Sequence, residues 1–184
     1  MLRWSLVVAI GSLLVIGRTG FKRGKLEPVA TYQVRFRELT SKEQRIYREM
    51  GEGLSEAERV RGEKGAWPSV ARLAADGIPP FAPDPLARDL TWSLRREGSL
   101  FGYVGESGSS GPAYLIWIQE PEPGVPGDPP NTPADEVHHP IAGGIILHVG
   151  SWIRARSPAP AGVPLRPWMH DWKQVIFQAP PEVK

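Results

Sequence analysis

Residues 90–105 read LTWSLRREGSLFGYVG, and residues 113–119 read AYLIWIQ. Over residues 90–94 apolar and polar side chains alternate, which is typical of a β-strand with one buried face. Residues 96–99 are suited to a turn, and residues 100–104 continue as a second strand. The stretch 113–119 is apolar on both faces, so it predicts a third, central strand. Together these residues predict an antiparallel meander.

Proline-rich connections separate the remaining elements of the C-terminal half. Residues 121–140 contain seven prolines and several acids, which predicts an irregular loop. Residues 141–154 (IAGGIILHVGSWIR) predict a fourth strand with a bulge at its glycines. Residues 168–178 predict a short terminal helix or strand. Its two tryptophans, Trp168 and Trp172, either pack on the sheet or form an exposed docking patch.

A long amphipathic helix is expected before the sheet. Thr40 and Glu43 have the spacing of a capping box, and an apolar stripe then continues to about Gly62. Gly51 and Gly53 each weaken this helix by about 1 kcal/mol relative to alanine. The stripe consists of Ile46, Met50, Leu54, Ala57 and Val60.

A second, shorter helix follows the first. Pro68 suits its first turn and Gly77 ends it. Residues 78–81 (IPPF) predict a rigid extended clamp that places Phe81 on the core. The predicted fold class is therefore α+β. One soluble domain, residues 26–184, packs two helices on one face of a four-stranded antiparallel meander.

The N-terminal residues 1–25 predict a membrane anchor helix with a basic flank. The stretch Trp4–Gly17 (WSLVVAIGSLLVIG) has no charge and is framed by Arg3 and Arg18. It is shorter than the about 20 residues of a full span, but snorkelling arginines and an interfacial tryptophan can extend it. No small-x-small cleavage site follows, so we expect an uncleaved single-pass anchor rather than a signal peptide. Residues 26–39 are expected to continue from it as helix.

The charge distribution argues against nucleic acid as a partner. The chain has 184 residues, with 22 lysines and arginines against 20 aspartates and glutamates. Five basic residues and no acid lie within residues 1–25, so the rest carries 17 basic and 20 acidic side chains, a net charge of −3. A phosphate-binding face needs clustered positive charge. The chain has no cysteine, which excludes disulfides, thiol catalysis and cysteine metal sites.

Most of the chain resembles a small bacterial family of unknown function. The resemblance lies in LTSKEQRIYREM (39–50), WPSVARLAADGIPPFAPD (67–84), LTWSLRREGSLFGYVG (90–105) and DWKQVIF (171–177). Its members are single-anchor membrane proteins encoded near metal-uptake ABC transporters. The resemblance implies a membrane-tethered accessory domain linked to metal handling, and it implies no catalytic residue. The chain departs from the family pattern at about residues 119–167, where its proline-rich insert is longer and carries extra histidines.

Two arguments about the membrane orientation disagree. Four basic residues follow the apolar stretch and one precedes it, which favours a cytoplasmic domain. A domain that serves metal uptake should instead face the periplasm, and export of a long domain can override a short basic cluster. Our expectation is a single-pass protein of the inner membrane with a periplasmic domain.

The four histidines are the candidate chemical groups. His138 and His139 end the proline-rich loop beside two acids, His148 lies on the fourth strand, and His170 is near the C-terminus. Imidazole and carboxylate suit zinc or another divalent first-row metal. Adjacent side chains of an extended chain point to opposite sides, so only one of His138 and His139 can take part. We predict a labile site of His139, His148 and His170, with His138 as the alternative to His139. The competing interpretation is that all four are surface residues.

Signals for catalysis are missing from the sequence. The loop GESGSSG (105–111) fits neither common phosphate-binding pattern and joins two strands, and no G-x-S-x-G is present. We therefore expect no enzyme activity and no cofactor other than zinc. The first function we expect is a membrane-tethered accessory domain with a transporter or another protein as partner. The alternatives are zinc binding or delivery, and an assembly subunit similar to pilins, although the cleavable leader and the acidic residue of pilins are missing.

Overall fold

The computed structural model describes residues 29–85, 89–108, 111–129 and 132–177. The predicted anchor, residues 1–25, lies outside this part of the chain. No helix among the described residues is long and apolar enough to cross a membrane.

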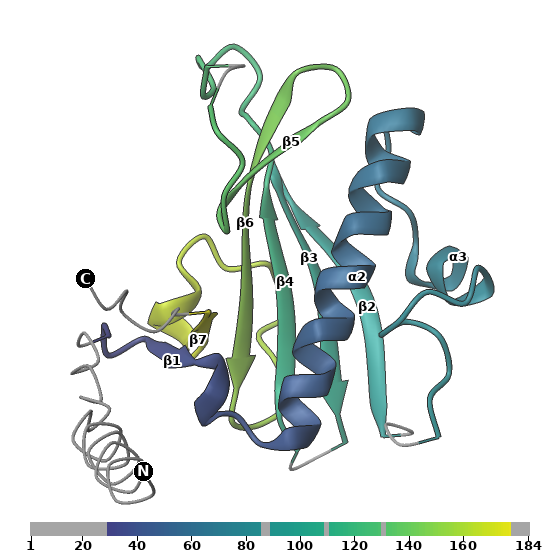
Figure 1. Cartoon of the computed structure of the whole chain (residues 1–184), viewed down its shortest axis with the longest axis vertical. Helices are drawn as coiled ribbons and strands as arrows, with labels where there is room; N and C mark the ends of the chain where they lie inside the picture. Colours follow the sequence, from purple (N-terminus) through teal and green to yellow (C-terminus); the bar gives the residue numbers. More distant parts are fainter. Residues whose placement is uncertain (1–28, 86–88, 109–110, 130–131, 178–184) are drawn as a thin grey trace, which may run out of the picture. The chain divides into compact units, whose positions relative to one another are not determined.

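The described chain is an α+β domain, as the sequence predicts, but its sheet has seven strands instead of four. Along the sheet the order is β1-β7-β6-β4-β3-β2, and β5 pairs with the same edge of β6 as β7 does (Figure 1). All neighbours are antiparallel except β1 and β7. The strands are β1 (Gln33–Arg35), β2 (Leu90–Glu97), β3 (Leu100–Ser107), β4 (Ala113–Gln119), β5 (His138–Ile141), β6 (Ile145–Arg154) and β7 (Lys173–Ile176).

The predicted meander corresponds to β2, β3 and β4, and the central β4 is almost wholly buried. The predicted fourth strand, residues 141–154, is wrong in one respect. It is a hairpin, because Gly143 and Gly144 adopt positive φ angles of 91° and 73° and turn the chain between β5 and β6. Left-handed φ values cost glycine little, so these glycines form a turn and not a bulge.

The two other additional strands, β1 and β7, are short segments that pair with each other in parallel. Residues 26–39 were expected to be helical, yet β1 and a single 3-10 turn, η1 (Phe36–Glu38), occupy their described part. The terminal residues 168–178 divide between a second 3-10 turn, η2 (Pro167–His170), and β7. Pairing with a distant strand determines these conformations, because three or four residues carry little local preference.

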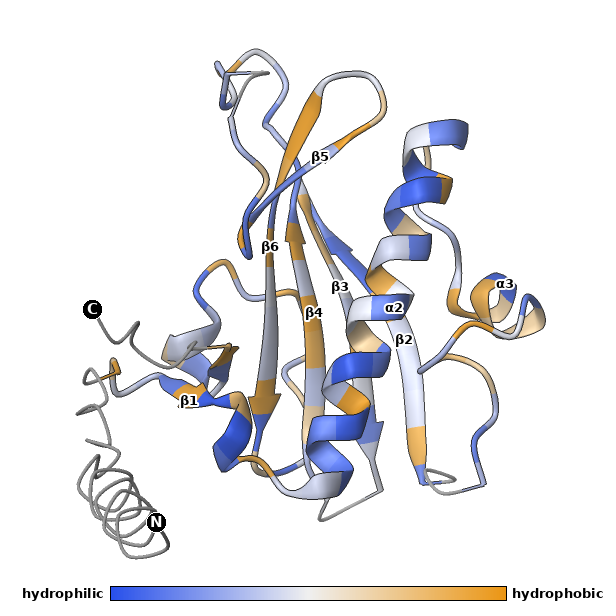
Figure 2. Cartoon of the chain, in the orientation of Figure 1, coloured by the Kyte–Doolittle hydropathy of each residue, from blue (hydrophilic) through white to orange (hydrophobic). Residues whose placement is uncertain are grey.

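Helix α2 (Ser41–Lys64) lies across one face of the sheet (Figure 1). The predicted capping box is confirmed, because Thr40 Oγ1 accepts from the Glu43 backbone N–H and Glu43 Oε2 accepts from the Thr40 N–H at 2.7 Å. The predicted apolar stripe is buried against the sheet, and Figure 2 shows hydrophobic and polar residues alternating along the helix. Gly65 ends the helix in the left-handed conformation that glycine adopts most easily.

Helix α3 (Val70–Ala75) and the clamp after it pack beside α2. Ser69 is the N-cap of α3, so Pro68 lies before the helix and not in its first turn as expected. The clamp is a turn and not the expected extended segment, because the N–H groups of Phe81 and Ala82 both donate to the Ile78 carbonyl. Phe81 is 6% exposed, which confirms its predicted place on the core. The Phe81 ring lies 5.4 Å from that of Trp92 and 5.1 Å from that of Tyr103, measured between centroids. The clamp therefore joins the helices to the sheet through an aromatic cluster.

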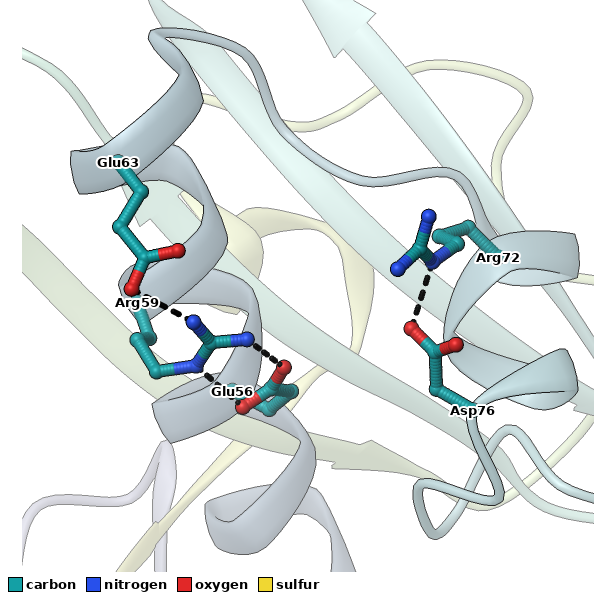
Figure 3. A network of polar contacts seen from close by, with 5 residues as sticks. All are labelled: Glu56, Arg59, Glu63, Arg72 and Asp76. Carbon is teal, nitrogen blue, oxygen red and sulfur yellow. Dashed lines mark hydrogen bonds and ion pairs between the residues drawn. The ribbon is translucent and has the colours of Figure 1, made fainter.

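The outer faces of both helices carry ion pairs. Arg59 contacts Glu56 and Glu63 along α2, and Arg72 contacts Asp76 at the end of α3 (Figure 3). Apart from the half-buried Glu56 these side chains are exposed, so solvent screening keeps their contribution to stability small. They mark the solvent side of the helical layer.

The opposite face of the sheet is covered by the chain that follows β6. Trp172 is 1% exposed and belongs to a second apolar cluster with Val104, Leu115 and Trp152. Trp168, in contrast, is 45% exposed. The two tryptophans four residues apart therefore differ in role, because η2 ends between them.

Candidate metal site

The β5–β6 hairpin brings two histidines together. His138 of β5 is the register partner of His148 of β6. Directly opposed residues share one face of a sheet, and their ring centroids here are 5.0 Å apart in a T-shaped arrangement.

The proline-rich loop adds a carboxylate to this pair. Asp128 Oδ2 lies 2.5 Å from His148 Nε2. Asp128, His138 and His148 can each offer one ligand atom, and these atoms all lie within 4.8 Å of one another. Among the residues the structure describes, this is the one group of three or more such side chains that could hold a metal ion.

Asp135 orients the His138 ring by contacting its Nδ1 atom. Its Oδ1 accepts hydrogen bonds from the backbone N–H groups of Val137 and His138, both at 2.7 Å. Both of its carboxylate oxygens lie 3.0 Å from His138 Nδ1. These hydrogen bonds, that of the His138 side chain above all, lower the pKa of Asp135 to about 2. Because an ionised carboxylate can only accept, Nδ1 of His138 is the donor to Asp135, and Nε2 is the nitrogen that faces away from this contact.

The neighbouring His139 points to the other side of β5, as the alternation of an extended chain requires. Its Nδ1 lies 2.7 Å from Glu58 Oε1 on α2. This contact raises the pKa of His139 above its ordinary value. His139 therefore links the hairpin to the helix.

His170, at the end of η2, is exposed and is not part of the group. Of the predicted ligands His139, His148 and His170, the structure thus brings only His148 into the cluster. His138, the alternative to His139, is the histidine that lies beside it. Whether any of these residues binds a metal stays a prediction.

Sequence reasoning missed Asp128. The proline-rich loop contains several acids, and neither periodicity nor spacing distinguishes the one that folds back onto β6. Asp128 and His148 both line a cleft of about 270 Å³, together with Glu120, Glu122, Val125 and Ile146. The cluster therefore borders a solvent-filled recess rather than the core.

The chain belongs to a family of unknown function, DUF6162, whose family model matches residues 34–179. No curated protein and no solved structure matches the chain. The match covers every described strand apart from the first residue of β1. The expected relation to an uncharacterised family is confirmed to this extent. The bacterial origin, membrane anchor and gene neighbourhood remain expectations.

Proposed function

We propose that this domain binds a divalent first-row metal ion, zinc above all, through Asp128, His138 and His148. We further propose that it does so as a membrane-tethered, non-enzymatic accessory protein of a metal-transport system. The observation that supports metal binding is the convergence of these three ligand atoms within 4.8 Å. The tether is the apolar stretch Trp4–Gly17, and the domain faces the periplasm.

The donor set suits zinc. Two imidazole nitrogens and one carboxylate oxygen are common zinc ligands, and a fourth position can take water or an exchanging ligand. Zinc–nitrogen bonds of about 2.0–2.1 Å separate tetrahedral ligands by roughly 3.4 Å. Asp128 Oδ2 and His148 Nε2, 2.5 Å apart, would therefore separate as the ion replaces the proton between them, and His138 would approach the ion by rotamer adjustment. Asp128 and His148 already contact each other and would accept the ion between them.

The surroundings favour a labile rather than a structural site. His138 and His148 are half-buried, and Asp128 is exposed. The adjacent cleft gives the ion a path to solvent. A protein that passes metal to a transporter needs such access, because an enclosed site releases its ion slowly.

The proposal is tested by calorimetric titration of the full chain in detergent with zinc chloride. We expect one ion per chain. His148→Ala should weaken binding by more than about 100-fold, beyond the loss usual for an outer-shell partner. Asp135→Asn, which removes only the orienting carboxylate, should weaken it by about 10- to 100-fold. Binding should also weaken as the pH falls, because protons compete with the metal ion for its ligand atoms.

The matched control is His170→Ala, which removes an exposed histidine outside the cluster. It should bind zinc as the unmodified chain does. Absence of heat at every zinc concentration would refute the proposed metal site. Equal losses in His170→Ala and His148→Ala would also refute it, in favour of a different ligand set.

A further inference from the structure

Exposed apolar side chains gather at one edge of the sheet. Seven large apolar residues are exposed in the described part of the chain, and four of them lie in η2 or directly beside β1 or β7. These elements lie together at the β1–β7 edge (Figure 1). We name this surface the apolar edge; it consists of Tyr32, Trp168, Met169 and Phe177.

The apolar edge is supported by buried neighbours. The Trp168 ring stacks on that of Trp152, which is 5% exposed, with the centroids 6.2 Å apart. On another side Tyr32 lies 5.6 Å from Trp168. Met169, beside it in η2, is 67% exposed. The positions of Trp168 and of Tyr32 beside it are therefore determined by packing on Trp152.

Both ends of the described domain lie at this edge. The described chain begins at Val29, three residues before Tyr32, and ends at Phe177, directly after β7. Residues 18–28 separate Val29 from the apolar stretch Trp4–Gly17 and reach at most about 40 Å when extended. If Trp4–Gly17 is in a bilayer, the apolar edge is within reach of the surface of that bilayer.

The composition of the edge suits the headgroup region of a membrane. Tryptophan and tyrosine are enriched at that depth, and basic side chains bind anionic headgroups. Arg37, Arg166 and Lys173 are exposed on or beside these elements, against two exposed acids, Glu38 and Asp171.

We infer that the apolar edge rests in the headgroup layer of the membrane that anchors the chain. The inference rests on the proposed tether. β7 pairs with the second half of β6, whereas β5 pairs with the first half. The apolar edge and the metal group, which consists of Asp128, His138 and His148, therefore lie at separate places on the sheet. Contact through the apolar edge would leave Asp128, His138 and His148 open to solution.

Because the chain has no cysteine, single-cysteine labelling tests this directly. Met169→Cys in the full chain is labelled with an environment-sensitive fluorophore and reconstituted into phosphatidylcholine–phosphatidylglycerol vesicles. Lipid with a nitroxide spin label near its headgroup is then added, and the nitroxide quenches fluorophores at that depth. For the label at Met169→Cys we expect emission that is blue-shifted relative to the protein without vesicles, and we expect the nitroxide to quench most of this emission. The matched control is Val125→Cys, an exposed apolar position in the loop beside the metal group, which should not be quenched.

Flotation of the same vesicles separates failure of the tether from failure of the inference. A chain that does not float with the vesicles refutes the tether and the inference together. A chain that floats while labelled Met169→Cys stays unquenched keeps the tether and overturns the inference. Equal quenching at both positions overturns it too, because the domain then adsorbs without a preferred face. A blue shift that depends on protein concentration and not on lipid shows a second copy on the edge and also overturns it.

Discussion

Two glycines in the middle of α2 should respond in opposite ways to the same substitution. Gly51 is exposed, and an added Cβ would meet no atom within 4 Å. Gly53, two residues further, is buried under the clamp. A Cβ there would lie 2.7 Å from the Pro79 carbonyl oxygen and 2.7 Å from the Phe81 ring. Gly51→Ala therefore measures helix propensity alone, and Gly53→Ala measures the same propensity together with the cost of overpacking.

The expected free energies of unfolding follow from these contacts. Gly51→Ala should stabilise the domain by about 1 kcal/mol, the full propensity difference in a helix interior. Gly53→Ala gains the same term but overpacks the clamp at a cost of about 2–3 kcal/mol, since the backbone oxygen cannot move without the clamp. The net expectation is a destabilisation of about 1–2 kcal/mol.

Thermal unfolding followed by circular dichroism measures both variants against the unmodified chain in the same detergent. A change of 1 kcal/mol corresponds to about 2–4 °C in Tm for a chain of this size. Gly51→Ala should thus raise Tm by a few degrees and Gly53→Ala should lower it. Equal stabilisation by both substitutions would show that α2 does not approach the clamp as closely as described, and would refute the reasoning.

Two further substitutions test buried and partly buried polar contacts. Tyr103 is fully buried and its hydroxyl donates to the Pro68 carbonyl at 2.8 Å, so Tyr103→Phe should destabilise by about 1–3 kcal/mol in urea unfolding. Tyr32→Phe, at the surface, is the control and should change little; equal effects would contradict the assignment. Glu58 raises the pKa of His139, so its stabilisation is fully present below the unfolded-state pKa of about 6.5 and is lost as the pH rises through the higher folded-state value. In zinc-free buffer the Tm of the unmodified chain should therefore fall as the pH rises through this range, and the Tm of Glu58→Gln should lack this fall. If Tm depends on pH in the same way in both proteins, the contact between Glu58 and His139 is refuted.

Local signals were sufficient where an element is long and half-buried. The stripe from Ile46 to Val60 repeats over several turns, and the Thr40–Glu43 capping box is complete within four residues, so α2 could be placed from the sequence. The same holds for β2 to β4, whose neighbours in the sheet are also neighbours in the chain. Such elements carry their own evidence, because their partners are close in sequence.

Long-range pairing was beyond the sequence. Gln33 and Gln174 are register partners and their side chains hydrogen bond at 3.2 Å, although 141 residues separate them. Strands of three and four residues show no periodicity that could identify them. For this reason the sequence predicts a four-stranded sheet, leaves residues 168–178 open between helix and strand, and misses β1 and its pairing with β7.

The candidate site shows the same limit on a smaller scale. Alternation along β5 predicts that only one of His138 and His139 can face His148, but it does not determine which. The position of the turn does. His138 and His148 both lie five residues from Gly143, at the centre of the turn, and are therefore opposed. Taking residues 141–154 as one continuous strand removed this information.

The two histidines of β5 lie on opposite faces of the sheet, where His139 contacts α2 and His138 contacts His148. His139 contacts Glu58, and the turn residue Ala142 packs so closely on α2 that a Cβ at Gly62 would lie 3.0 Å from the Ala142 Cβ. These contacts hold the hairpin against a helix that is itself buried on the sheet. A ligand set is more effective when its backbone is already fixed, because less conformational entropy is lost on binding. The contact through His139 thus fixes the backbone that carries His138 and His148, while Asp128 comes from the proline-rich loop and already contacts His148.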